Sequence, residues 1–170
     1  MGLQVREMTL AETAIVIDYF HSATPEHLEM LGVDPTRLPR AKLWRELFEA
    51  EYALTADQRR NIFLLWLADD RPAGFSSCDK IVPGDRANMH LHVLDVGDRN
   101  KGAGTIFVRQ SVDFYFARLK LKSLFCEPHA FNVAPNRTLQ KAGFKYLKTH
   151  MTVPGPLNFH QAVTRWVIER

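Results

Sequence analysis

The sequence predicts a mixed α/β (α+β) fold, in which one mixed and mostly antiparallel sheet of about seven strands carries helices on both faces. Seven short segments are either dense apolar runs or alternate apolar and polar residues, and both patterns are typical of strands. One pair of consecutive strands is separated by a glycine loop and a helix, which is the crossover that two parallel strands need. The 170 residues, 46% of them hydrophobic, are enough for one domain over residues 1–170 with a substantial core.

The first half of the chain is expected to form a strand, helical segments and a hairpin. Thr9 and Glu12 have the capping-box spacing that starts a helix directly after the first strand. Three prolines then break the chain into short pieces before a second helix, in which Leu43 and Leu47 recur at helical spacing. A turn-forming Asp-Asp-Arg-Pro-Ala-Gly stretch joins two further strands. The expected strands are residues 3–9, 61–70 and 73–82, and the second helix is 39–54.

The second half is expected to contain the crossover and a closing strand pair. The segment after the glycine loop has apolar residues near helical spacing over residues 104–121. Asn132 is a capping residue that opens a further helix, and Gly143 fits the C-cap of that helix. The expected strands are residues 87–96, 122–128, 144–153 and 160–170.

Composition argues against several classes of function. The 22 basic and 19 acidic residues are dispersed and leave a net charge of only +3, which does not favour nucleic acid as a partner. No apolar run approaches the roughly 18 residues of a membrane span, and the N-terminal stretch lacks a signal-peptide pattern. We therefore expect a cytoplasmic protein without membrane association. Cys78 and Cys126 are expected to be free, buried thiols.

The glycine loop has the composition of an anion site. The first amides of a helix lack internal partners and carry the positive end of the helix dipole, so a strand that enters a helix through such a loop favours an anion. Gly102 and Gly104 let the backbone approach a phosphate closely, and Arg99 and Lys101 add positive charge. Neither the P-loop spacing nor the G-x-G-x-x-G dinucleotide fingerprint is present. The pattern that remains is R-x-x-G-x-G.

A second stretch, "EPHAFNVAPNRTLQKAGFKYL" at residues 127–147, makes this pattern more specific. An asparagine after a strand opens a helix there, and the helix ends at Gly143-Phe144. Together with R-x-x-G-x-G, the stretch resembles the GNAT superfamily of acyl-CoA-dependent N-acyltransferases over about residues 89–146. The resemblance implies a sheet that is splayed at its middle, and acetyl-CoA as the co-substrate.

The resemblance also implies how CoA is bound. The loop amides would bind the CoA pyrophosphate, and the preceding strand would pair with the pantetheine arm. Asn132 matches the asparagine that contacts pantetheine near the thioester, and the Leu94 amide is by position the one that holds the thioester carbonyl. The implied cofactor-binding residues are Leu94, Asp95, Val96, Arg99, Asn100, Lys101, Gly102, Ala103, Gly104, Thr105 and Asn132.

The catalytic groups follow less directly from the resemblance. Leu139 stands where family members often have a tyrosine that protonates the leaving thiolate, so water or another group must supply that proton. His90 and His92 point to the same face of their strand, and an imidazole suits proton removal from an amine. Glu127 and Asp95 are acidic alternatives at strand ends.

Other interpretations of these residues remain open. A His-x-His strand pair binds a metal only with further ligands, and no spaced third ligand is found, so no metal is expected. Both rings can instead be structural, bonded within the sheet or packed beneath a helix. Cys126 could form an acyl-cysteine, but a buried structural thiol is the expectation.

The expected reaction is acetyl transfer from acetyl-CoA to a primary amine of a small molecule, by direct attack on the thioester. The resemblance places the acceptor between residues 21–40 and 152–161, with Tyr19, His27 and Glu29 shaping the site. The alternatives are acetylation of a protein N-terminus or lysine, and a catalytically inactive acyl-CoA-binding module. The resemblance also suggests a homodimer paired through the last strand.

Overall fold

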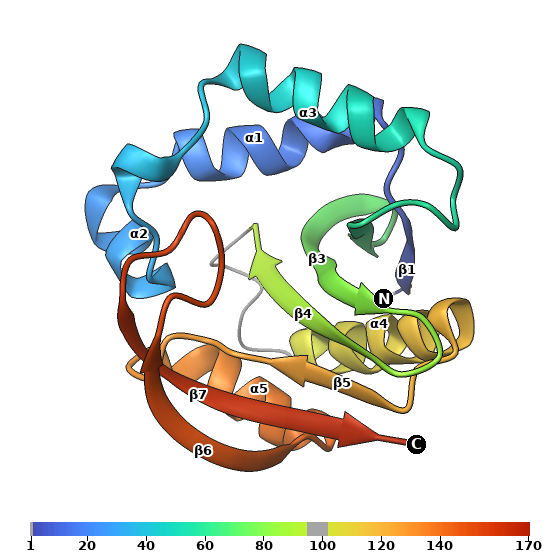
Figure 1. Cartoon of the computed structure of the whole chain (residues 1–170), viewed down its shortest axis with the longest axis vertical. Helices are drawn as coiled ribbons and strands as arrows, with labels where there is room; N and C mark the ends of the chain where they lie inside the picture. Colours follow the sequence, from blue (N-terminus) through green and yellow to red (C-terminus); the bar gives the residue numbers. More distant parts are fainter. Residues whose placement is uncertain (1, 95–101) are drawn as a thin grey trace.

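A computed structural model describes residues 2–94 and 102–170 and contains one seven-stranded sheet, in the order β1-β2-β3-β4-β5-β7-β6 (Figure 1). The strands are β1 (Leu3–Glu7), β2 (Ile62–Ala68), β3 (Arg71–Val82), β4 (Arg86–Val93), β5 (Ser123–Cys126), β6 (Lys145–Thr152) and β7 (Gln161–Glu169). The α-helices are α1 (Ala14–His21), α2 (Pro25–Leu31), α3 (Ala41–Ala53), α4 (Ala103–Leu119) and α5 (Val133–Ala142). All strand pairs are antiparallel except β4 and β5, which confirms the predicted mixed sheet.

Helices cover both faces of the sheet, as the sequence predicts. The side of β2 that carries Leu65 and Leu67 packs with Phe20 of α1 and Phe48 of α3. The other side packs against α4 and α5, and α1 and α3 lie side by side away from them (Figure 1). Within the described ranges, no helix combines the length and the apolar character needed to cross a membrane.

The N-terminal helical region differs from the expectation in detail. The capping box is present, because the Thr9 N–H donates to the Glu12 carboxylate at 2.9 Å and the Glu12 N–H donates to Thr9 Oγ1 at 3.4 Å. The first turn, Ala11–Thr13, is a 3₁₀ helix, and α1 begins only at Ala14. The proline-rich region that follows contains the short helix α2, which the sequence patterns did not single out.

A buried hydrogen-bond network fixes α4 against the sheet. The indole N–H of Trp66 donates to Ser111 Oγ at 2.9 Å, and Ser76 Oγ bonds Ser111 Oγ at 3.2 Å and Tyr115 Oη at 3.0 Å. Burial raises the pKa of Tyr115, so the phenol stays neutral. The network orients the helix whose N-terminus follows the glycine loop, and it assigns Trp66 to the core.

The sheet opens between β4 and β5. These strands pair only from Arg86–Ser123 to Met89–Cys126, after which β5 ends. β4 continues along β3 to Val93, so its last four residues have no partner strand on the β5 side, and the two strands diverge (Figure 1). The splayed sheet that the resemblance implies is therefore present.

Replacing Gly74 by alanine is expected to destabilise the fold. A Cβ at this position would lie 2.6 Å from the His92 carbonyl oxygen and 2.7 Å from the Trp66 ring, so the sheet would have to shift. Overpacking of this kind costs about 1–3 kcal/mol, measurable by urea unfolding. Gly104→Ala is the control, because its Cβ would meet only Thr138 Cγ2, at 3.8 Å. Equal stability of the two variants would contradict the packing argument.

Candidate active site

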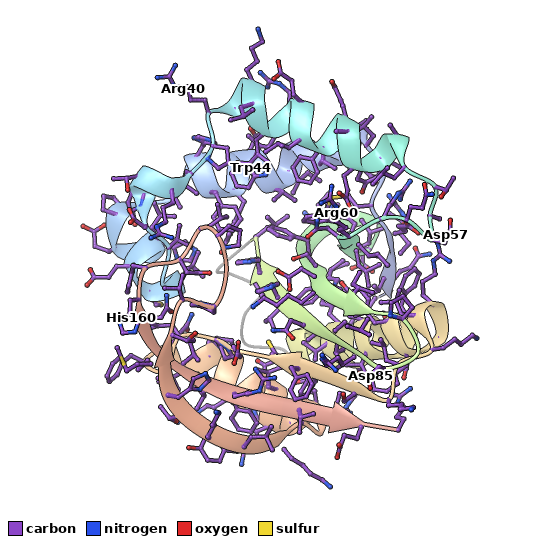
Figure 2. All side chains as sticks on the ribbon, in the orientation of Figure 1. Arg40, Trp44, Asp57, Arg60, Asp85 and His160 are labelled. Carbon is purple, nitrogen blue, oxygen red and sulfur yellow. The ribbon has the colours of Figure 1, made fainter. Side chains whose placement is uncertain are left out.

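The opening between β4 and β5 leads into a cavity of about 600 Å³. Its walls come from α1 and α3, from the middle of β3, from β4 and the end of β5, and from the loop between β6 and β7. The lining also includes Asn132 and Pro135 at α5, so the cavity is continuous from the α3 side of the sheet to the start of α5. Trp44 lies on the inner side of α3, whereas Arg40 points away from the molecule (Figure 2).

His90 lies in this cavity next to a carboxylate. In the β3–β4 register Ser77 lies opposite His90 and Asp79 lies opposite Asn88, so Asp79 shares the sheet face of His90. His90 Nε2 is 3.1 Å from Asp79 Oδ1, and this oxygen makes no aligned hydrogen bond with the described residues. The His90 side chain is 30% exposed, so an imidazole beside a carboxylate faces the cavity.

His92 has a different environment, although it shares the face of His90. Its ring packs against the rings of Phe75, Phe20 and Tyr19, with centroid distances of 4.9, 5.1 and 5.2 Å. Burial, with smaller contributions from His90 and His27, lowers the pKa of His92 to about 3. His92 is therefore neutral near pH 7 and too weak a base to hold a proton taken from an ammonium group.

His92 should make the fold sensitive to acid. An unfolded histidine takes up a proton below its ordinary pKa of 6.5, whereas the folded His92 does so only near pH 3. Its contribution to stability is thus present above pH 6.5 and is lost as the pH falls toward 3, by at most about 1.4 kcal/mol per pH unit. We expect the free energy of unfolding of His92→Phe to fall less than that of wild type between pH 7 and pH 5, by urea titration. Parallel losses would exclude His92 as the cause.

Glu127 reaches the cavity but is already paired. Its Oε1 lies 2.7 Å from Arg165 Nη1 and 3.6 Å from His150 Nε2, and its side chain is only 7% exposed. The Arg165 guanidinium is in turn held over the Phe125 ring, 4.2 Å from its centroid. This geometry ties the end of β5 to β6 and β7, and it leaves the Glu127 carboxylate more constrained than the His90 imidazole.

The direction of the N–H groups of β4 differs from the expectation. The Leu94 N–H, expected to hold the thioester carbonyl, donates instead to the Ala73 carbonyl oxygen at 3.0 Å. Because backbone groups alternate in direction along a strand, the N–H groups of Leu91 and Val93 point away from β3 and toward the opening. These two amides are therefore the ones placed to meet a ligand there.

The described part of the glycine loop has a helix-start geometry. Gly102 is the N-cap of α4 with φ +73°, a left-handed conformation that favours glycine, and its carbonyl accepts from the Thr105 N–H at 3.1 Å. The helix begins at Ala103, one residue before the expected start, so the amides of Ala103 and Gly104 lie in its unpaired first turn. The candidates Asp95, Val96, Arg99, Asn100 and Lys101 lie outside the described residues.

The start of α5 contributes one further polar group. Asn132 occupies the N-cap position, but its side chain makes no capping bond and lines the cavity. The Asn132 carbonyl accepts from Asn136 Nδ2 at 2.8 Å, which fixes its position. Leu139, at the place of the family tyrosine, is fully buried in the core.

The remaining sequence candidates are Cys126 and three residues that were expected to shape the acceptor site, Tyr19, His27 and Glu29. Burial raises the pKa of the Cys126 thiol, which disfavours the thiolate that an acyl-cysteine would need. Tyr19 Oη lies 2.9 Å from His27 Nε2, and neither these two residues nor Glu29 is part of the cavity lining. Over the described part of the chain, no group of three or more histidine, cysteine or acidic residues is placed to hold a metal ion.

Hydrogen bonds join the two segments that were expected to wall the acceptor site. The Gly32 carbonyl accepts from Asn158 Nδ2 at 2.9 Å and from Gln161 Nε2 at 2.7 Å, and the Asp34 N–H donates to the Leu157 carbonyl at 2.8 Å. The β6–β7 loop is thus fixed to the end of α2. Asp79 and this closure were both missed by sequence reasoning, although the hairpin register could have placed Asp79 near His90.

Residues 3–145 match the acetyltransferase (GNAT) domain in a comparison with protein families. The chain therefore belongs to the GNAT family of acetyltransferases, the class that the splayed sheet and the loop-to-helix junction define. No curated protein sequence matches it significantly.

Solved structures agree with this fold. Spermidine N-acetyltransferase from Vibrio cholerae, in complex with CoA and spermine, is 14% identical with a TM-score of 0.79, over 98% of this chain and 95% of the other. RimL, a ribosomal-protein α-N-acetyltransferase in complex with CoA, is 14% identical with a TM-score of 0.77, over 99% and 94%. Aminoglycoside acetyltransferase AAC(6')-Ib, in complex with CoA and kanamycin, is 16% identical with a TM-score of 0.72, over 99% and 95%. At these identities the likeness concerns the fold alone.

Proposed function

We propose that residues 1–170 form a single, cytoplasmic N-acetyltransferase domain that transfers an acetyl group from acetyl-CoA to a primary amine of a small molecule. The observation that carries this proposal is the cavity beside the opened strands, with the His90–Asp79 pair inside it. A cavity of about 600 Å³ is in the size range of small-molecule sites.

The described residues are suited to hold the donor. Gly102 presents the N-terminus of α4, where unpaired amides and the helix dipole favour a pyrophosphate. The outward amides of Leu91 and Val93 offer strand-like pairing to the two amide groups of pantetheine, and Asn132 offers a side-chain amide at the far wall. The donor would thus lie where β5 stops accompanying β4.

The reaction requires one proton acceptor and a positioned thioester. The neutral amine attacks the thioester carbonyl carbon, the new C–N bond forms as the C–S bond breaks, and the CoA thiolate leaves. His90 accepts the proton that the ammonium group must lose, directly or through a water, while the Asp79 carboxylate beside it stabilises the imidazolium that forms. The attacking nitrogen loses a second proton as the amide forms, and water carries this proton to the thiolate, since Leu139 replaces the usual acid and a thiolate is a good leaving group.

The pinned β6–β7 loop favours a small acceptor over a folded protein. Its bonds to Gly32 and Asp34 close one side of the cavity, so an acceptor must fit within the remaining space. A protein lysine or N-terminus would have to enter as an extended chain through the open mouth.

Release of free CoA thiol from acetyl-CoA over a panel of small amines and amino-terminal peptides tests the proposal. We expect turnover with at least one small amine, and no turnover with amino-terminal peptides at the same concentration. Tight CoA binding, measured by calorimetry, without thiol release for any acceptor would instead identify an inactive acyl-CoA-binding module.

A further inference from the structure

One wall of the cavity consists of aromatic rings. Trp44 and Phe48 of α3 stack nearly parallel, at 4° and 6.4 Å between centroids, and Phe20 of α1 lies 5.6 Å from Trp44. Phe63 of β2 continues this wall with its ring 5.1 Å from Phe48. All four residues line the cavity, and Trp44 keeps part of its surface exposed there.

The β6–β7 loop contributes apolar residues to the same cavity. Pro154, Pro156 and Leu157 belong to the lining, and the bonds from this loop to Gly32 hold it in place. Proline rings and aromatic faces both bind flat apolar groups well. Together with the aromatic wall, this loop makes the space beyond His90 suited to an apolar body.

Each acidic group of the lining already lies against another group of the protein. Glu51 accepts from the backbone N–H groups of Arg60 and Asn61, the latter at 2.7 Å. Asp79 lies against His90 at 3.1 Å, and Glu127 against Arg165 at 2.7 Å. These three are the acidic side chains of the described lining, which also contains two arginines, Arg37 and Arg60. A second ammonium group in this cavity would therefore have to compete with these partners for a carboxylate, in a lining that also carries two guanidinium groups.

From these observations we infer that the acceptor is a monoamine whose body is one aromatic ring or an apolar group of similar size, bound against Trp44. This rests on the proposed N-acetyltransferase activity. It separates the chain from acceptors such as spermidine and kanamycin, which carry several ammonium groups.

A competition between amine classes tests the inference on the full chain. We expect kcat/KM for phenethylamine to exceed that for spermidine and for kanamycin by about tenfold or more, in the thiol-release assay with acetyl-CoA. Higher turnover of spermidine, kanamycin or a peptide amino terminus would overturn the inference and leave N-acetyl transfer itself intact.

Substitution of Trp44 tests the placement. Trp44→Ala should raise the KM for phenethylamine about tenfold with little change in kcat, because it removes contacts made equally in the ground state and the transition state. Trp44→Phe should recover most of the loss. Leu43→Ala is the matched control, since Leu43 precedes Trp44 on α3, is 50% exposed and is not part of the lining.

Calorimetry distinguishes failure of the inference from failure of the proposed function. If no amine releases thiol but phenethylamine binds the CoA-loaded protein, and Trp44→Ala raises its Kd about tenfold, the acceptor class stands without the activity. If phenethylamine neither binds nor reacts, or if Leu43→Ala weakens it as much as Trp44→Ala, the inference is wrong.

Discussion

Replacing His90 by glutamine is expected to lower kcat/KM by about 10²- to 10³-fold without changing the affinity for CoA. His90 is an imidazole of the cavity lining with a carboxylate 3.1 Å from its Nε2, and general-base catalysis typically contributes about 10²–10⁴-fold. Steady-state kinetics across pH would show the effect most clearly, because glutamine cannot accept the proton: the loss should be largest near neutral pH and smaller at high pH, where the amine is already deprotonated in solution.

Two further variants serve as comparisons for His90→Gln, one at its partner and one at a different histidine. Asp79→Asn keeps the shape of the partner but removes its charge, so we expect a smaller loss of about tenfold in kcat/KM. His150→Gln changes a histidine that lies 3.6 Å from Glu127, away from Asp79, and should retain activity within about threefold. A full rate in His90→Gln with an unchanged pH profile would place the base elsewhere.

Replacing Gly102 by valine is expected to raise the Kd for CoA by about 10- to 100-fold while the protein stays folded. Gly102 has φ +73° at the start of α4, and a β-branched residue is strained by about 1–3 kcal/mol in this region. The variant would relax away from the glycine conformation, and CoA binding would have to restore it. Isothermal titration with CoA measures the change.

Gly84 provides a closely matched control. It has φ +76° in the turn between β3 and β4, at the opposite end of β4 from the opening, and a Cβ at either glycine meets no atom of the described residues within 4 Å. Gly84→Val should therefore lower thermal stability as Gly102→Val does but leave CoA affinity unchanged. Equal affinities of the two variants for CoA would refute the assignment of this helix start to the donor.

The order of helices and strands along the chain could be predicted because each element carries a local signal. The apolar runs, the capping box at Thr9 and the C-cap at Gly143 all depend on neighbours close in the chain, and they are present in the structure. Helix α2 was not predicted because Pro25 is its first residue and Pro35 follows it closely, although Thr24 caps it and Gly32 ends it in the left-handed conformation. The capping signals were thus present, but they lay in a segment in which prolines argued against a helix.

The site was less accessible because it depends on register and long-range contacts. The alternation of side chains along a strand placed two histidines on one face. Only the rings packed around His92 show that its environment differs from that of His90. Leu94 was misassigned because the direction of a strand amide depends on which residues pair in β3. The bonds that fix the β6–β7 loop join Gly32 to residues 126 and 129 positions away, beyond the reach of any local pattern.

The parting of β4 and β5 has a consequence for the order in which two substrates bind. The cavity runs through this opening to α5. A pantetheine arm lying between the two strands would therefore close the cavity on the side of the opening. An amine that binds before acetyl-CoA would enter a cavity that is still open between β4 and β5, with few groups to hold it. We therefore expect a compulsory sequence with acetyl-CoA entering first, and CoA acting as a competitive product inhibitor toward acetyl-CoA but not toward the amine.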